Sequence, residues 1–250
     1  MIVYINQFKR TIKLLFGIPE VRSAYVIKLL GYIPGFKFKY ERVSRIQERS
    51  SFKGIALGMR RTELWFRNNM LLKVTLESAQ AVSAFHFYLN RPTRNFFKAI
   101  RFLENKGYLF NNHAQMKIFE PGCGTGKYLS AYIDKYGGKG IGIDVYKPAI
   151  EIAEHSAINN RVKFSCMDVT HVSEVSRLIG DRVDIVFTSS FLVHINNSRN
   201  KRRQLLELFK DKSGVVFGLE KKDDGLINDL ISSGYKVYTV DNTIVFVSES

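Results

Sequence analysis

Three glycines at alternate positions are the feature of the sequence that most clearly points to chemistry. Gly122, Gly124 and Gly126 follow an apolar stretch that ends at Phe119, and an expected helix comes next. Glycine lets the backbone turn sharply and lets a ligand lie against it without side-chain interference. The spacing differs from the G-x-G-x-x-G of dinucleotide-binding turns and lacks the Gly-Lys-Ser/Thr ending of a phosphate-binding loop. It therefore argues against a dinucleotide-dependent dehydrogenase and against an ATPase.

The elements that must position this turn are short apolar runs that alternate with helical patterns from residue 116 onward. Such alternation is typical of a parallel sheet covered by helices. Tyr235–Val240 and Thr243–Val247, separated by Asp241-Asn242, predict an antiparallel hairpin. The sequence predicts an α/β doubly wound sheet, mostly parallel with a C-terminal antiparallel hairpin strand. The expected parallel strands are Lys117–Glu120, Gly140–Asp144, Val162–Met167, Asp184–Thr188 and Val215–Leu219.

This combination of turn and strands resembles the class I, Rossmann-like, S-adenosylmethionine-dependent methyltransferases. The first motif of that family is an acidic residue followed by G-x-G-x-G, and the acidic residue here is Glu120. The resemblance extends over residues 90–250 and is strongest around the ends of the expected strands. It implies that the cofactor is S-adenosylmethionine and the product S-adenosylhomocysteine.

The resemblance also implies a cofactor role for individual residues. The three glycines would line the methionine part, Asp144 would accept hydrogen bonds from both ribose hydroxyls, and Asp168 would accept from the adenine amine. A carboxylate suits the ribose because each of its oxygens can accept one hydroxyl. Val145 would pack on the adenine, with Met167 nearby. The complete set of expected cofactor contacts is Glu120, Gly122, Cys123, Gly124, Gly126, Asp144, Val145, Met167, Asp168 and Ser189.

Two of these acidic residues have a structural alternative. Asp144 could cap a helix near Lys147, and Asp168 could cap the helix that includes Val172 and Val175. We favour the cofactor role for both because each lies at the end of an expected strand.

His194 is the candidate base. It lies in Thr188–Ile195, a stretch that resembles one in many small-molecule methyltransferases and ends in an apolar-His-apolar step. Histidine titrates near neutral pH and could accept the proton released when a hydroxyl or amine attacks the methyl group. A helix-start histidine that binds the backbone is the alternative. Because the sulfonium is already activated, orientation and water exclusion can also supply much of the acceleration.

Several family members are excluded by what this stretch lacks. It contains no Asn/Asp-Pro-Pro-aromatic motif and no Pro-Cys pair, so methylation of base amines and a cytosine-C5 mechanism are both disfavoured. The two cysteines have no metal-ligand spacing, and no acidic cluster for magnesium is evident, so we expect no metal site.

The N-terminal part of the chain is strongly basic. Residues 1–110 hold 20 Lys and Arg against 6 Asp and Glu, whereas residues 111–250 hold 18 against 17. We therefore expect a basic, mainly helical extension or lid over residues 1–90 and a cofactor-binding methyltransferase domain over residues 91–250. Such asymmetry favours an anionic partner, which charge alone does not identify.

Helical patterns dominate this extension. Apolar residues at 5, 8, 12, 15 and 16 predict a basic amphipathic helix. Its apolar face could contact a membrane, pack on the catalytic domain or mediate self-association. Val21–Leu30, Leu71–Leu89 and Thr93–Asn105 read as further helices, and residues 36–62 as a loop or mobile helix.

The sequence thus favours methylation of an oxygen or nitrogen of a small molecule or saccharide, in one version lipid-linked and reached at the membrane. No uninterrupted apolar run reaches the roughly 18 residues of a membrane span, and we expect a cytoplasmic enzyme, peripheral on the inner face of the membrane. One alternative is an RNA methyltransferase whose basic extension binds the substrate backbone. Another is an inactive cofactor-binding interaction subunit. The oligomeric state stays open.

Overall fold

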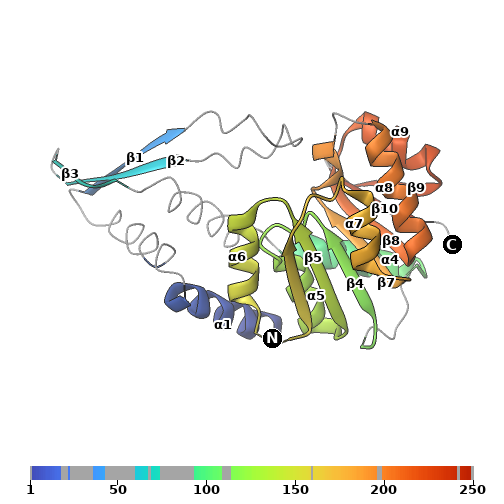
Figure 1. Cartoon of the computed structure of the whole chain (residues 1–250), viewed down its shortest axis with the longest axis horizontal. Helices are drawn as coiled ribbons and strands as arrows, with labels where there is room; N and C mark the ends of the chain where they lie inside the picture. Colours follow the sequence, from blue (N-terminus) through green and yellow to red (C-terminus); the bar gives the residue numbers. More distant parts are fainter. Residues whose placement is uncertain are drawn as a thin grey trace.

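The structure is a computed structural model in which a central sheet is enclosed by helices (Figure 1). It describes residues 2–17, 22, 36–42, 60–66, 69–73, 93–108, 114–158, 160–195, 199–240 and 243–248.

The central sheet confirms the predicted fold class. Its strands are β4 (Lys117–Pro121), β5 (Lys139–Asp144), β6 (Val162–Cys166), β7 (Val183–Ser189), β8 (Ser213–Lys221), β9 (Tyr235–Val240) and β10 (Thr243–Ser248). They lie in the order β6-β5-β4-β7-β8-β10-β9. Strands β4 to β8 pair in parallel, whereas β10 runs antiparallel to both β8 and β9. The five parallel strands and the hairpin were thus predicted within one or two residues of their ends.

Helices cover both faces of this sheet. One face is covered by α4 (Thr93–Asn105), α5 (Lys127–Tyr136) and α6 (Lys147–Ser156), and the other by α7 (Val172–Ile179), α8 (Arg199–Lys212) and α9 (Asp224–Ser232). Neighbouring strand residues alternate between the two cores: Ile118 belongs to the first and Phe119 to the second, and both are fully buried. The predicted bounds of α4 match the structure.

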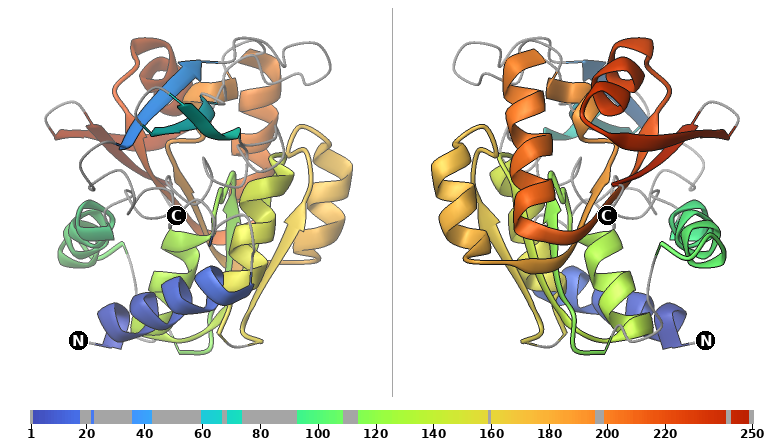
Figure 2. Two further views of the ribbon diagram at one scale, coloured as in Figure 1. Left: turned by 90° about the vertical axis from the view of Figure 1, so that its left-hand side faces the viewer. Right: turned by 90° about the vertical axis from the view of Figure 1, so that its right-hand side faces the viewer.

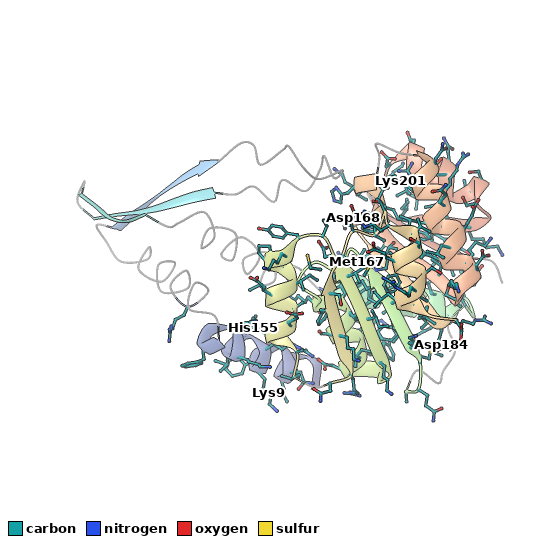
Figure 3. All side chains as sticks on the ribbon, in the orientation of Figure 1. Lys9, His155, Met167, Asp168, Asp184 and Lys201 are labelled. Carbon is teal, nitrogen blue, oxygen red and sulfur yellow. The ribbon has the colours of Figure 1, made fainter. Side chains whose placement is uncertain are left out.

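The strand order reverses between β4 and β7, which are neighbours although far apart in the chain. In open α/β sheets, ligands bind outside the carboxyl ends of the strands at such a reversal. The turns that leave β4, β5, β6 and β7 all lie at this edge, where Figure 3 labels Met167 and Asp168. Asp184, at the start of β7, lies at the opposite end of the sheet (Figure 3).

The N-terminal region contains strands that we did not predict. β1 (Phe36–Arg42), β2 (Arg60–Phe66) and β3 (Asn69–Lys73) form an antiparallel sheet in the order β1-β2-β3. The expectation of loop or helix was wrong at these residues. The missed signal is the alternation of Phe36, Phe38 and Tyr40 with charged residues, a period of two that favours a strand. The predicted helix Val21–Leu30 lies outside the described residues except for Arg22, and so does most of Leu71–Leu89.

The first predicted helix is present as α1 (Ile2–Gly17), which packs against α5 and α6 (Figure 2). The guanidinium of Arg10 is buried and donates two hydrogen bonds to the carboxylate of Asp134 on α5, one of them 2.9 Å long. Lys13 Nζ donates to the carbonyl of Ala157 at 2.6 Å, and Leu14 is fully buried. No helix among the described residues has the length and hydropathy to cross a bilayer.

Candidate active site

The glycine turn between β4 and α5 needs glycine for two separate reasons. Gly122, Gly124 and Gly126 all adopt positive φ angles, of 66°, 54° and 65°, which other residues rarely adopt. The turn is also tightly enclosed by aromatic rings. A Cβ atom on Gly122 would lie 2.2 Å from the Phe191 ring, and one on Gly126 would lie 2.3 Å from the Phe164 ring. Any side chain at these two positions would therefore displace a buried ring.

Glu120 stabilises the start of α5, directly after this turn. The residue is completely buried at the end of β4, and its Oε2 accepts a hydrogen bond of 3.2 Å from the backbone N–H of Leu129. Leu129 lies in the first turn of α5, where backbone N–H groups lack partners within the helix. The carboxylate therefore replaces the side-chain cap that Gly126, the N-cap residue, cannot provide.

Asp144 connects the glycine turn to the end of β5. Its Oδ2 accepts from the N–H of Gly124 and its Oδ1 from the N–H of Tyr146, each at 2.8 Å. The helix-capping alternative is not supported, because α6 begins after Tyr146 and has no side-chain cap. A carboxylate can accept about four hydrogen bonds, so binding these amides is compatible with accepting ribose hydroxyls as well. Val145, the next residue, is half-buried.

Asp168 and Met167 follow β6 at the same edge (Figure 3). Asp168 Oδ1 accepts from the N–H of Thr170 at 2.8 Å, whereas α7 begins only after His171. The alternative that Asp168 caps α7 is therefore wrong. The N–H of Met167 donates to the carbonyl of Asp144 at 3.0 Å, which joins the turn after β6 to the end of β5.

His194 lies on the turn that follows β7. This turn enters η1, a 3-10 helix over Leu192–Ile195, in which the N–H of His194 donates to the carbonyl of Phe191 at 3.0 Å. The imidazole is partly exposed, and partial burial lowers its pKa below the ordinary value of 6.5, while the negative charge of Asp144 opposes that shift. The ring is therefore mostly neutral at pH 7 and lies within electrostatic reach of the β5 carboxylate.

The turn after β7 also contains a strained residue. Ser190 has a φ of 52°, which makes it the one non-glycine residue with positive φ in the part of the chain that the structure describes. Such a conformation costs about 1–3 kcal/mol and persists only where the surroundings impose it. Here the N–H of Ser190 donates to the carbonyl of Leu219 on β8 at 3.0 Å. The neighbouring Ser189 is buried at the end of β7.

Sequence reasoning missed Glu220, which lies beside this turn at the end of β8. It is buried, and its Oε1 accepts hydrogen bonds from Thr188 Oγ1 and from the N–H groups of Phe191 and Leu192. Burial raises its pKa to about 7, whereas these hydrogen bonds lower it. No local pattern marks Glu220, because its partners lie about thirty residues earlier in the chain.

The structure thus brings the predicted site residues together from four strand ends. Gly124 donates to Asp144, Gly122 lies against Phe191, and Cys123 is fully buried with its N–H donating to the carbonyl of Ile143 at 2.9 Å. Among the described residues, no three His, Cys, Asp or Glu side chains are grouped as metal ligands would be.

Comparison with known families supports the interpretation of this edge. Residues 118–211 match the family model described as a methyltransferase domain. That segment extends from β4 to α8 and includes the glycine turn, Asp144, Asp168 and His194. The chain contains a class I methyltransferase domain. The resemblance of the first motif implies S-adenosylmethionine as the methyl donor of such a domain.

Solved structures resemble this methyltransferase domain in fold. A chain from the complex of the Haloferax volcanii Trm112 methyltransferase activator with a methyltransferase is 12% identical, covering 68% of this chain and 93% of that one, with a TM-score of 0.50. An O-methyltransferase family protein from Burkholderia thailandensis is 10% identical, covering 69% and 59%, with a TM-score of 0.50. Magnesium protoporphyrin IX methyltransferase from Synechocystis, solved with bound S-adenosylmethionine, is 12% identical, covering 72% and 86%, with a TM-score of 0.47.

At such identities, these likenesses describe the fold and leave the acceptor open. No curated protein sequence matches the chain significantly.

Proposed function

We propose that the chain transfers a methyl group from S-adenosylmethionine to an oxygen or nitrogen of a small molecule or saccharide. The observation that supports this proposal is the convergence of the glycine turn, Asp144, Asp168 and His194 on one sheet edge. In this proposal the glycine turn and Asp144 hold the methionine and ribose parts, and Asp168 holds the adenine. Val145, Met167, Cys123 and Ser189 complete the contacts.

The chemistry requires one bond to form and one to break. The acceptor oxygen or nitrogen bonds to the methyl carbon while the carbon–sulfur bond breaks, and that electron pair stays on sulfur as S-adenosylhomocysteine leaves. The acceptor proton then passes to His194, whose lowered pKa keeps the imidazole neutral and able to accept it. His194 thus acts as the base, and the rest of the turn orients the acceptor.

The ribose assignment can be tested on the ligand and the protein together. Isothermal calorimetry would compare S-adenosylmethionine with an analogue that lacks the ribose hydroxyls, for the native chain and for Asp144→Asn. We expect loss of the hydroxyls to weaken binding by about tenfold or more in the native chain, and much less in Asp144→Asn. Asp181→Asn is the matched control, because Asp181 is exposed at the opposite end of the sheet. An equal loss in all three proteins would refute the assignment.

We further propose that the enzyme works at the inner face of the membrane on a lipid-linked acceptor. The supporting observation is the outer face of α1, which we define as Ile5, Phe8, Ile12 and Phe16. These side chains are 46%, 67%, 39% and 74% exposed, whereas Arg10 on the opposite side is 4% exposed. These exposures favour an external partner over the alternative that this apolar face packs on the catalytic domain. An amphipathic helix that buries its arginine and exposes its phenylalanines needs another apolar environment.

Charge favours an anionic membrane over self-association as that environment. Lys9 borders the outer face, is exposed and points away from the domain in Figure 3, whereas Lys13 donates to the carbonyl of Ala157. Two copies joined through this face would bring their Lys9 side chains toward each other, in a region whose net charge is already strongly positive. At an anionic surface Lys9 instead contributes about 1 kcal/mol, and each inserted apolar side chain about 1.5–3 kcal/mol.

Vesicle co-sedimentation tests this docking. We expect the native chain to pellet with vesicles of phosphatidylcholine and phosphatidylglycerol, and less with phosphatidylcholine alone. The double variant Phe8→Ser, Phe16→Ser should stay in the supernatant. Ile231→Ser is the control, because Ile231 is 59% exposed on α9 at another surface. If the double variant pellets like the native chain, docking by this face is refuted. Salt-sensitive binding to RNA without vesicle binding would favour an RNA substrate instead.

A further inference from the structure

Glu220 joins the end of β8 to the whole turn that follows β7. Strands β7 and β8 are parallel, with Ser189 opposite Leu219, so Glu220 lies one residue beyond the last paired position. Its Oε1 accepts from Thr188 Oγ1 at 2.9 Å, from the N–H of Phe191 at 3.1 Å and from that of Leu192 at 3.2 Å. One oxygen atom thus holds both sides of the strained residue Ser190.

A carboxylate suits this position for a physical reason. The N–H groups at the start of a helical turn have no partners within it, and they favour a negative charge placed before them. Phe191, Leu192 and Val193 direct their N–H groups toward Glu220, and each of these contacts stabilises the ionised form. The side chain is 1% exposed, so water does not replace it. Without the carboxylate these donors would lose their shared acceptor.

The turn that Glu220 holds contacts both halves of the proposed reaction. Its first aromatic ring, Phe191, lies against Gly122 of the cofactor turn, and its 3-10 helix contains His194. The N–H of His194 bonds back to the carbonyl of Phe191, so the position of the imidazole depends on the backbone that Glu220 fixes. Glu220 itself accepts no hydrogen bond from the glycine turn among the contacts that the structure describes.

We propose that Glu220 is a positioning residue that fixes His194 relative to the methyl donor and leaves the affinity for the donor to the turns after β4, β5 and β6. This inference rests on the proposed function, because it takes His194 as the base. Substitution of Glu220 should therefore change the environment of His194 while binding of S-adenosylmethionine is retained. A purely structural carboxylate would affect both or neither.

The test uses two measurements that do not depend on knowing the acceptor. Nuclear magnetic resonance of ring-labelled histidine reports the titration of His194, assigned with His194→Gln, and calorimetry reports affinity for S-adenosylmethionine. In Glu220→Ala and Glu220→Asp we expect the pKa of His194 to move toward its ordinary value. Affinity for S-adenosylmethionine should stay within about threefold of native, a change smaller than one lost hydrogen bond produces.

Glu220→Gln is the rescuing variant, since its amide oxygen can accept from the same donors; it should keep His194 close to native. Glu220→Asp keeps the carboxylate but shortens the side chain by one methylene group. It therefore still tests the proposal if Glu220→Ala does not fold. A native His194 titration in both disruptive variants would overturn the proposal. So would a loss of cofactor affinity as large as that of a glycine-turn variant. If His194 moves as expected but His194→Gln retains full methyl transfer, the positioning inference stands and the assignment of the base fails.

Discussion

The turns after β4 and β7 solve the same structural problem in different ways. Each leaves a parallel strand at the same edge and enters a helical segment, and each is supported by a buried glutamate that accepts backbone N–H groups. After β4 that residue is Glu120, which precedes its own turn in the chain. After β7 it is Glu220, on the neighbouring strand β8.

The two turns also obtain their unusual backbone angles differently. The glycine turn uses glycine at each position with positive φ, so its shape is encoded locally. The turn after β7 places Ser190 at a φ of 52° and holds it by hydrogen bonds to β8. The backbone conformation of the turn after β4 is therefore determined by its own residues, whereas that of the turn after β7 depends on contacts with the folded sheet. A change in β8 should disturb the acceptor half of the site and spare the cofactor half.

The largest effect should come from substitution of Gly122, where the glycine turn contacts the Phe191 ring of the turn after β7. In Gly122→Ala the positive φ costs about 1–2 kcal/mol, and the clash with the Phe191 ring adds about 1–3 kcal/mol. We expect a loss of about 2–5 kcal/mol in the free energy of unfolding and a loss of S-adenosylmethionine binding. Denaturant unfolding and calorimetry measure the two effects.

Gly107→Ala is the matched control for this change. Gly107 has a φ of 79°, but a Cβ atom there would meet nothing within 4 Å, so the variant isolates the backbone cost. A double-mutant cycle with Phe191→Ala then isolates the contact, since Gly122→Ala should cost less once the ring is absent. Equal costs with and without the ring would show that the turns are not coupled through Phe191.

The next effect concerns the pH dependence of stability. Burial raises the pKa of Glu220 from 4.5 to about 7, so between these values the folded chain binds a proton that the unfolded chain has released. Raising the pH through this window therefore favours unfolding. The contribution of Glu220 is fully present below about pH 4.5 and is lost above about pH 7, on the order of 3 kcal/mol in all.

Thermal unfolding of the native chain and of Glu220→Gln, followed from pH 5 to pH 8 in steps, would measure this slope. Glutamine does not titrate, so the difference in stability between the two proteins should shift in favour of the variant as the pH rises. The same comparison for Glu120→Gln gives a reference for a buried glutamate of the other turn. A difference between native and Glu220→Gln that does not change with pH would contradict the raised pKa.

The contrast between the two turns also explains what the sequence could predict. The sheet, the terminal hairpin and α4 were predictable because their apolar periods are strong and their ends are marked by glycine, proline or acidic residues. The glycine turn was predictable because three residues in a row of five encode it. Glu220 was not, because a buried glutamate is identified only by the strand that lies beside it in space.

The N-terminal errors have a different cause. The apolar stripe of α1 predicted the helix but not its orientation, since Arg10 is buried only because Asp134 of α5 lies opposite it. For β1, the lysines between the aromatic residues suggested a basic surface, although alternation with a period of two is the pattern of a strand. The high content of basic residues thus drew attention away from the strand-like alternation in this region.

The smallest effect should be that of His194 itself, and it distinguishes a base from an orienting residue. A general base typically contributes 10²–10⁴-fold, and because the sulfonium is already activated we expect the lower end, about 100-fold, in His194→Gln. The assay is transfer of labelled methyl from S-adenosylmethionine to acceptors in a cell fraction, at saturating cofactor. Cofactor affinity should not change, because His194 is not among the proposed cofactor contacts.

The pH profile makes this last prediction specific. Since the base must be neutral, the rate of the native chain should rise with pH through the lowered pKa of His194, below 6.5, and level off above it. In His194→Gln that rise should disappear, leaving a slow rate that no longer follows this titration. A rise that persists in the variant would assign the titration to another group, and Glu220, with a pKa of about 7, would then be the first to examine. Loss of the rise in Glu220→Asp as well would show that the geometry that Glu220 imposes on the turn after β7, more than its charge, limits the reaction.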